Sequence, residues 1–442
     1  MKEFDIIIIG AGPGGYTTAA LAARLGMNVA VVECENLGGT CLNRGCIPTK
    51  CLAATAEAML SASRFAALGV NVEGVSLDYA RAAARKDAVV ESLREAVAGI
   101  LGQVTVVKGE ARFTGATTIE VDGETLTAPK IIVATGSRPA TLPIPGAELA
   151  VDSDFMLAAT VLPQSAIIIG GGVIGMEFAS ILGACGCKVT VLEYAPDILP
   201  GFDADISKRL RMSLKRRGIT ITPSACVTAI EDTGAGRRVA YTLKGKEKAV
   251  EADSVIIAAG RRPVLPSGLE ALGPDMHRGF LTVDADTMQT SIPGIYAVGD
   301  VNGICMLAHA AEAQGRVALG LASRLDTVPA AVFTVPECAS VGLTEQQCAD
   351  MGMTFKTGTA IYRSSGKALV MDEPDGMVKV IIGQRGKLLG CHICGAHASD
   401  LIQEMSVAIS SGLSATDIVT TIHPHPTLSE LLVSALEAAL RN

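Results

Sequence analysis

The chain has 442 residues, of which 47 are glycine and 3% are aromatic, and its formal net charge is −8. This length exceeds what one hydrophobic core usually accommodates, so more than one domain is predicted. The negative charge argues against nucleic acid as a main partner, and no apolar run approaches the roughly 20 residues of a membrane-spanning helix. The glycine-rich, aromatic-poor composition favours an α/β protein.

The first predicted element is the apolar strand 6–9, followed by a glycine-rich turn, a helix to Gly26 and a strand ending at Glu33. This arrangement is typical of a dinucleotide-binding unit. Its first glycine makes the tight turn, its second lets the backbone approach a pyrophosphate, and its third packs the helix against the strand. The glycines of this turn are Gly10, Gly12, Gly14 and Gly15. The acidic start and short apolar run do not form a secretory signal, so a cytosolic protein is predicted.

Two cysteines, Cys41 and Cys46, follow this unit. On a regular helix their separation would mean ~7.5 Å of rise and ~140° of rotation, whereas a disulfide needs Cα atoms within ~7 Å of each other. The pair can close only if the backbone is irregular, and Gly45 and Pro48 suit such a distortion. Because so small a loop stabilises a fold little, the pair is predicted to have a redox role.

Amphipathic patterning predicts helices at 52–68 and 78–101. A second copy of the first unit then begins at residue 167. In both copies the first glycine precedes the acidic residue by 23 positions, from Gly10 to Glu33 and from Gly170 to Glu193. Two complete copies make a chance match very improbable and predict two dinucleotide sites.

Each copy is followed by a β-rich extension. The two extensions end in similar short sequences, at residues 131–139 and 255–263. These apolar runs are predicted to be buried strands that bring backbone close to a nucleotide. A further buried strand is predicted at 292–300. After about residue 327 the pattern changes to alternating strands with helices near 399–411 and 428–440, which indicates a separate C-terminal domain.

Most of the 12 cysteines are interpreted as small core residues. This group includes Cys185, Cys187, Cys226, Cys305 and Cys348. Cys391 and Cys394 have a metal-like spacing, but no second Cys/His pair completes a site. Residues 388–394 also read as a strand, in which these two side chains would point to opposite faces. No metal is predicted.

The combination of these motifs resembles the pyridine nucleotide-disulfide oxidoreductases over essentially the whole chain. The resemblance rests on the two repeats, the Cys-x4-Cys motif, the Gly299-Asp300 strand end and the segment His423-Pro424-His425-Pro426-Thr427-Leu428-Ser429-Glu430. It implies an α/β fold with two Rossmann-like dinucleotide-binding domains and a C-terminal α+β dimerisation domain. The predicted divisions are an FAD domain at 1–148, an NAD domain at 149–264, a central domain completing the FAD site at 265–327 and the dimerisation domain at 328–442.

The resemblance also implies the cofactor sites. The implied FAD contacts are Gly10, Gly12, Gly14, Gly15, Glu33, Gly39, Thr40, Lys50, Ala111, Thr135, Gly136, Ser137, Gly299, Asp300, Met306, Leu307, Ala308 and His309. The implied NAD contacts are Gly170, Gly172, Val173, Gly175, Glu193, Val227 and Gly260. A carboxylate at Glu193 would repel a 2′-phosphate, and Tyr194 and Pro200 stand where NADP-using relatives carry arginines. NAD is therefore predicted rather than NADP.

For the chemistry, the resemblance implies that Cys41 exchanges with the substrate and Cys46 faces the flavin. Lys50 is expected near the flavin, paired with Glu177. His425 is the implied base, since imidazole titrates near neutral pH, and Glu430 is expected to orient it. In this family the histidine serves the disulfide of the other subunit, so a homodimer is implied, with helix 399–404 at its interface.

The implied activity is oxidation of protein-bound dihydrolipoamide with reduction of NAD+ to NADH. The implied partner is a lipoyl-bearing acyltransferase of a 2-oxoacid dehydrogenase complex or a glycine cleavage carrier protein. A reductase of another low-molecular-weight disulfide, driven by NAD(P)H, stays open as an alternative. So do two residue roles. Arg44 replaces a valine common in the motif, and its charge could lower the pKa of Cys46, attract an anionic partner or face solvent; the role of His423 is not assigned.

Overall fold

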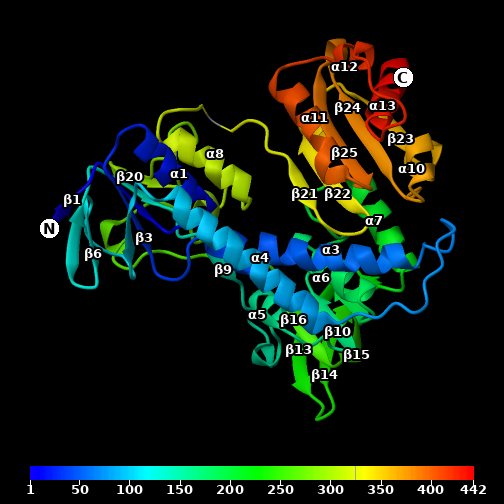
Figure 1. The fold of residues 1–442 in the computed structure, drawn as a ribbon, viewed down its shortest axis with the longest axis horizontal. Coiled ribbons are helices and arrows are strands. Elements are labelled where there is room, and N and C mark those ends of the chain that lie inside the picture. The colour runs from blue at the N-terminus through cyan, green and yellow to red at the C-terminus, as the bar shows by residue number, and fades with distance from the viewer. Residues whose placement is uncertain (324) are drawn as a thin grey trace.

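The structure is a computed structural model that describes residues 1–323 and 325–442. Its N-terminal lobe is built on a parallel sheet with the strand order β20-β8-β2-β3-β4 (Figure 1). These strands are β2 (Ile6–Ile9), β3 (Val29–Glu33), β4 (Thr105–Lys108), β8 (Lys130–Val133) and β20 (Ile295–Ala297). Ile7 and Ile9 pack in one core cluster and Ile6 and Ile8 in another, so both faces of the sheet are buried.

The cysteine motif of this lobe lies on helices, with Cys41 on α2 (Gly39–Arg44) and Cys46 on α3 (Cys46–Ala62). The other helices of the lobe are α1 (Pro13–Arg24), α4 (Tyr79–Ile100) and α8 (Ala308–Ala318). Helices α3 and α4 cross the middle of the molecule towards the other two lobes (Figure 1). A small sheet adds β1 (Lys2–Glu3), β7 (Glu124–Thr127), β6 (Thr118–Val121) and β5 (Arg112–Gly115). Because β20 pairs with β8, the chain returns to the first sheet after residue 264. The exact boundaries of the four predicted domains stay predictions.

The second repeat forms its own parallel sheet, with the order β12-β11-β10-β16. Its strands are β10 (Ser165–Ile169), β11 (Lys188–Leu192), β12 (Thr220–Thr222) and β16 (Ser254–Ile257). Its helices are α5 (Ser153–Ala158), α6 (Val173–Ala184) and α7 (Ala204–Arg216), beside an antiparallel sheet of β13 (Ala225–Asp232), β14 (Arg237–Leu243) and β15 (Lys246–Ala252). The two similar sequences that end the β-rich extensions pair with each other. Strand β9 (Ser137–Pro139) is hydrogen-bonded antiparallel to β17 (Arg261–Pro263), and this pairing joins the two lobes.

The C-terminal domain contains an antiparallel sheet of order β21-β22-β25-β24-β23. Its strands are β21 (Ala330–Val332), β22 (Glu337–Gly342), β23 (Lys356–Ile361), β24 (Met377–Ile382) and β25 (Leu388–Gly395). Its helices are α9 (Glu345–Asp350), α10 (Gly366–Val370), α11 (Ala398–Ser410), α12 (Ala415–Thr420) and α13 (Glu430–Arg441). This mixed α/β architecture, with two Rossmann-like units and an α+β domain, confirms the predicted fold class.

The predicted helices exist, with shifted ends. Helix α3 begins at Cys46 rather than at 52, because the helix restarts directly after the irregular Gly45, and it ends at Ala62 rather than 68. Helix α13 begins at Glu430 rather than at 428. In the C-terminal domain α9, α10 and α12 were missed, although capping boxes mark the starts of α9 (Thr344 and Gln347) and α12 (Ser414 and Asp417). The predicted strand 292–300 is shorter, since only Ile295–Ala297 forms β20.

The cysteine interpretation is wrong at one position. Cys187 and Cys348 are buried and Cys185 and Cys305 are half-buried, but Cys226, on β13, is exposed. Cys391 and Cys394 pack in different core clusters, which confirms that they face opposite sides of β25. Among the described residues, no group of three His, Cys, Asp or Glu side chains is arranged to hold a metal ion. None of the helices described is long and apolar enough to cross a membrane.

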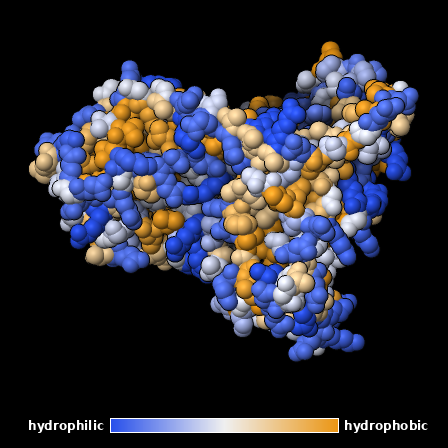
Figure 2. Space-filling model, turned by 60° about the horizontal axis from the view of Figure 1, so that its bottom comes forward, coloured by the Kyte–Doolittle hydropathy of each residue, from blue (hydrophilic) through white to orange (hydrophobic). Residues whose placement is uncertain are grey.

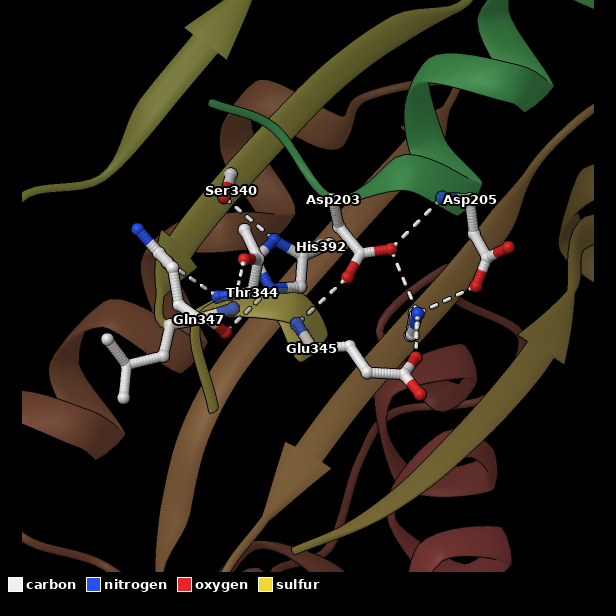
Figure 3. A network of polar contacts seen from close by, with 9 residues as sticks. Asp203, Asp205, Ser340, Thr344, Glu345, Gln347 and His392 are labelled. Atoms are coloured by element: carbon white, nitrogen blue, oxygen red, sulfur yellow. Dashed lines mark hydrogen bonds and ion pairs between the residues drawn. The ribbon is translucent and has the colours of Figure 1, made fainter. Parts of the chain in front are cut away.

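A buried lysine, Lys379, joins the second lobe to the C-terminal domain. Figure 3 shows the three carboxylates of this cluster, Asp203, Asp205 and Glu345. The Nζ atom of Lys379, on β24, lies 2.9 Å from Asp203 Oδ1, 2.6 Å from Asp205 Oδ2 and 2.5 Å from Glu345 Oε2. Burial alone would raise the pKa of Asp203, but the hydrogen bond from Lys379 holds that pKa below its usual 3.8. Beside this cluster His392 is buried, and burial lowers its pKa.

Replacing Lys379 by methionine is expected to destabilise the protein by about 3–5 kcal/mol, because Asp203 would be left buried without its partner. Thermal melting of the holoenzyme measures the effect, with the exposed Lys356→Met on β23 as the control. The contribution of Asp203 is present above pH 3.8 and is lost as the pH falls through its lower folded pKa. Equal melting temperatures for both variants would contradict this role for the cluster.

Candidate functional site

One large cleft, with a volume of about 1700 Å³, lies where the two repeats meet the C-terminal domain. Figure 2 shows hydrophobic residues in the middle of the molecule, where the lobes meet, as well as on the left lobe. The cleft brings together most of the residues predicted from sequence: Gly10, Gly12, Gly14, Glu33, Gly39, Thr40, Cys41, Cys46, Lys50, Ala111, Thr135, Gly136, Ser137, Gly170, Gly172, Val173, Glu177, Glu193, Val227, Gly260, Gly299, Asp300, Met306, Leu307, Ala308 and His309. Gly15, Gly175, His425 and Glu430 do not line it.

The two glycine-rich turns have nearly the same geometry. Gly10 and Gly170 have φ angles of +102° and +112°, which favour glycine. A Cβ on Gly15 would lie 1.9 Å from the carbonyl oxygen of Gly10, and one on Gly175 would lie 2.0 Å from that of Gly170. Gly15 and Gly175 are thus absent from the cleft because they pack helix against strand, as the motif predicts for the third glycine.

The acidic residues at the strand ends also match. Glu33 accepts backbone N–H groups from Ala11 and Glu35, each at 2.7 Å. Glu193 accepts the corresponding ones from Gly171 and Ala195. Each carboxylate therefore fixes the glycine turn as well as facing the cleft, where its remaining lone pairs can accept ribose hydroxyls.

Replacing Glu193 by alanine is expected to weaken NADH binding about tenfold or more, because a charged acceptor and the turn it fixes are both lost. Calorimetric titration of the FAD-loaded protein with NADH measures the effect, and Glu231→Ala, at an exposed position on β13, is the control. FAD content should be unchanged. An NADH affinity equal to that of the wild type would remove Glu193 from the site.

Asp300, at the end of the Gly-Asp segment, belongs to a polar network that sequence reasoning found only in part. Its Oδ2 accepts a 2.5 Å hydrogen bond from Ser137, whose Oγ in turn accepts one of 2.7 Å from Arg261 Nε. The neighbouring Gly299 donates its N–H to Gln314, a fully buried side chain on α8, at 2.7 Å. Arg261 and Gln314 were not predicted, although Arg261 directly follows the predicted Gly260.

The backbone between the two cysteines is irregular, as predicted. Helix α2 ends and α3 begins at Gly45, whose φ of −145° and ψ of −110° are not helical. A Cβ at this position would approach the carbonyl oxygen of Thr40 to 2.9 Å and the Cα of Cys41 to 3.3 Å. The break therefore brings the turn carrying Cys46 against the helix carrying Cys41.

The two thiols are chemically unlike. Both cysteines are free and half-buried, and their side chains are hydrogen-bonded to each other. The hydrogen bond from Cys41, helped by the nearby charge of Lys50, lowers the pKa of Cys46 to about 7. The same hydrogen bond, together with burial, raises the pKa of Cys41 well above its usual range. Cys46 is therefore the sulfur that ionises as the pH rises through about 7, while Cys41 keeps its proton.

Lys50 stands one turn after Cys46 and is paired as predicted. Its Nζ lies 2.9 Å from Glu177 Oε1 and 4.4 Å from the centre of the Phe333 ring. Glu177 also accepts the backbone N–H of Phe333 at 2.9 Å. Phe333 was not predicted; its contact spans the boundary between the first lobe and the C-terminal domain, so no local sequence signal could reveal it.

Arg44 bridges two carboxylates. Its guanidinium lies 2.5 Å from Glu35 and 3.3 Å from Asp154 on α5. Its charge is therefore matched within the protein, and it ties the cysteine helix to the second lobe. The charge that lowers the pKa of Cys46 belongs to Lys50 instead.

His425 and Glu430 form a pair outside the cleft. The Nδ1 atom of His425 lies 2.9 Å from Glu430 Oε1, while Thr427 donates its N–H to the other oxygen at 2.8 Å. These hydrogen bonds lower the pKa of Glu430, so the residue stays anionic. The His425 side chain is 80% exposed, and in a single chain it does not line the cleft that holds the cysteines.

The cleft fits two dinucleotides. Helices α1 and α6 begin at Gly12 and Gly172 with no side-chain cap, so their first N–H groups can receive phosphates. Each start is backed by a glycine turn and a buried glutamate, in two matching halves of one cleft. The cysteine pair lies in the same cleft, which is therefore suited to redox chemistry with two nucleotide cofactors.

Comparison with known proteins agrees with this geometry. The family described as pyridine nucleotide-disulphide oxidoreductase matches residues 4–315, and its dimerisation domain matches residues 328–436. The chain belongs to the pyridine nucleotide-disulphide oxidoreductase family. Its cofactors are FAD and NAD, which the family and its relatives use. The match to the dimerisation domain supports a homodimer.

Particular relatives narrow the class further. Dihydrolipoyl dehydrogenase of Geobacillus stearothermophilus is 39% identical over 99% of this chain and 96% of its own length. That of Staphylococcus aureus is 40% identical over 99% and 97%. Among solved structures, the HOCl-induced flavoprotein disulfide reductase RclA of Escherichia coli, as a Cu(II) complex, matches with a TM-score of 0.87 and 28% identity, over 99% of both chains.

Proposed function

We propose that this protein oxidises dihydrolipoyl groups carried on other proteins and reduces NAD+ to NADH. The observation that carries the proposal is the unlike pair Cys41 and Cys46, in a cleft shared by two dinucleotide-binding units. The full-length similarity to dihydrolipoyl dehydrogenases supports the choice of substrate. In the overall reaction a dithiol and NAD+ give a cyclic disulfide, NADH and a proton.

The pKa difference supports different roles for the two sulfurs. In the oxidised protein, a substrate thiolate attacks Cys41 Sγ, the bond between the cysteines breaks, and Cys46 leaves as a thiolate. The lower pKa of Cys46 makes it the better leaving group. The second substrate thiolate then displaces Cys41 and completes the substrate disulfide, leaving both cysteines reduced. Bound FAD supplies the two-electron link between the reduced pair and NAD+.

We assign the base role to His425. Its Nδ1 is engaged by Glu430, so its Nε2 can take the proton from a substrate thiol. Because His425 is exposed and outside the cleft of its own chain, we infer that it serves the cysteines of a second copy in the homodimer. Lys50, held by Glu177, would place its positive charge beside the flavin and the Cys46 thiolate.

A steady-state assay of the purified FAD-loaded protein tests the proposal. NAD+ with dihydrolipoamide is expected to give rapid turnover, and NADP+ much slower turnover. The competing function is an NAD(P)H-dependent reductase of another disulfide, favoured by the similarity to the disulfide reductase RclA. Faster reaction of NADH or NADPH with oxidised glutathione or another small disulfide than of NAD+ with dihydrolipoamide would replace the proposed function by that one.

We propose a lipoyl-bearing acyltransferase or a glycine cleavage carrier protein as the natural partner, because the chain is similar over its full length to dihydrolipoyl dehydrogenases. Turnover with a purified lipoylated domain, in place of free dihydrolipoamide, distinguishes these carriers. The cytosolic location inferred from the sequence stays a prediction.

A further inference from the structure

The segment that carries His425 contains a second histidine–glutamate pair. The Nε2 atom of His423 lies 2.9 Å from Glu404 Oε1, and its Nδ1 lies 2.9 Å from the carbonyl oxygen of Thr421. Unlike His425, the His423 side chain is only 10% exposed. Glu404 belongs to α11, whereas Glu430, the partner of His425, belongs to the helix that directly follows the segment.

The partners of His423 require both of its ring nitrogens to donate. A backbone carbonyl and a carboxylate are acceptors only, so each can be satisfied only by an N–H of the ring. His423 is therefore an imidazolium cation in this arrangement. Burial alone would lower the pKa of His423, but the hydrogen bond to Glu404 outweighs it, and the pKa is raised above its usual 6.5.

His425 is built differently. The geometry of its pair occupies Nδ1 and leaves Nε2 without a hydrogen bond to any of the residues that the structure describes, in a ring that is 80% exposed. Ile422, on the other side of His423, is 95% exposed. Residues on both sides of His423 are thus exposed, whereas the largely buried His423 attaches the segment to α11 through Glu404.

We propose that His423 is a cationic positioning residue, whose hydrogen bonds to Glu404 and Thr421 fix the exposed segment so that His425 is held at the correct place. This inference rests on the proposed function, in which His425 is the base. His423 does not touch the substrate; it acts through the backbone of Pro424, between the two histidines.

Helix α11, to which His423 is attached through Glu404, also lines the cleft. Ser399, Gln403 and Ser406, at helical spacing on α11, line the same cleft as the cysteines. The helix that shapes the cleft of one chain is thereby joined to the segment that we infer to serve the second copy. The charged groups that face His423 are Glu404 on α11 and Glu430 on α13.

The test compares His423→Gln, Glu404→Gln and the double variant as FAD-loaded dimers. Each single variant is expected to lower kcat for dihydrolipoamide by about tenfold or more, the effect of a misplaced catalytic group. The double variant should be no slower than the slower single variant, because both changes remove one interaction. Electron transfer from NADH to ferricyanide, which needs no base, should be unchanged. The control is His277→Gln, at an exposed histidine on β18 (Met276–His277).

The pH profile separates this role from a merely structural one. The imidazolium anchor is present below the usual histidine pKa and is lost as the pH rises through the raised folded value. The advantage of the wild type over His423→Gln should therefore shrink as the pH increases. A difference that is constant with pH, or turnover within about twofold of wild type, would overturn the proposal.

Amide hydrogen exchange provides a readout that does not depend on activity. Exchange of residues 421–429 is expected to be faster in His423→Gln than in the wild type and in His277→Gln. If the wild type fails to oxidise dihydrolipoamide, the proposed function is wrong, but faster exchange still supports the anchor. Unchanged exchange in this segment overturns the anchor whatever the substrate proves to be.

Discussion

Replacement of Cys46 by serine is expected to lower dihydrolipoamide turnover by about 10⁴-fold or more, because the exchange has lost its leaving thiolate. It should also abolish the long-wavelength absorbance that a cysteine thiolate gives beside an oxidised flavin. The physical reason is the pKa of about 7, which makes Cys46 the thiolate of the pair near neutral pH. Absorbance spectra of the half-reduced protein, with steady-state rates, measure both effects.

Two further variants make this test specific. Cys41→Ser should also lose turnover but keep the long-wavelength absorbance, since its hydroxyl can still donate to the Cys46 thiolate. Cys51→Ser changes a half-buried cysteine of the same helix, five positions after Cys46, and should behave like the wild type in both assays. If the absorbance survives in Cys46→Ser or disappears in Cys41→Ser, the assignment of the two sulfurs must be reversed.

Replacement of His425 by glutamine is expected to lower dihydrolipoamide turnover by about 10²- to 10⁴-fold, the usual contribution of a general base. FAD should stay bound, and electron transfer from NADH to ferricyanide should be unchanged, because neither needs this imidazole. The residual activity of the variant should rise with pH as more of the substrate thiol ionises without help. Normal turnover at neutral pH would remove His425 as the base.

A hybrid dimer tests whether the base and the cysteines come from different chains. Cys46→Ser and His425→Gln subunits, each inactive alone, can be co-expressed with two different tags and purified as the mixed dimer. If His425 serves the other subunit, one site of the hybrid has both wild-type cysteines and a wild-type His425, so about half of the wild-type activity should return. A hybrid without activity would place base and cysteines in one chain and contradict the inferred arrangement.

Much of the site followed from local sequence because its parts are local structures. A glycine at +102° or +112°, a helix start without a side-chain cap and a glutamate 23 positions later belong to one strand–turn–helix–strand unit. The break between the cysteines likewise needs only Gly45. The errors concern short helices and one side chain: α9, α10 and α12 have six, five and six residues, and Cys226 is exposed although it lies on an apolar strand.

Charge partners were less predictable, because they are chosen by contacts between segments far apart in the chain. Arg44 had three open roles, and the fold satisfied it with Glu35 and Asp154. Lys379 carried no signal, yet it holds two domains together. His423 and His425 look alike in sequence, and only their different acceptors and exposure separate an anchoring cation from a free base.

The sequence by itself determined two dinucleotide-binding units, a redox cysteine pair and a C-terminal domain. Glycine spacing and hydrophobic periodicity are local properties of the sequence, so they can be recognised without the fold. The tertiary structure alone decided which sulfur is the thiolate, because that depends on the hydrogen bond between Cys41 and Cys46 and on the nearby charge of Lys50. It also decided that His425 lies outside its own cleft. Both follow from distances between side chains, which the folded backbone sets.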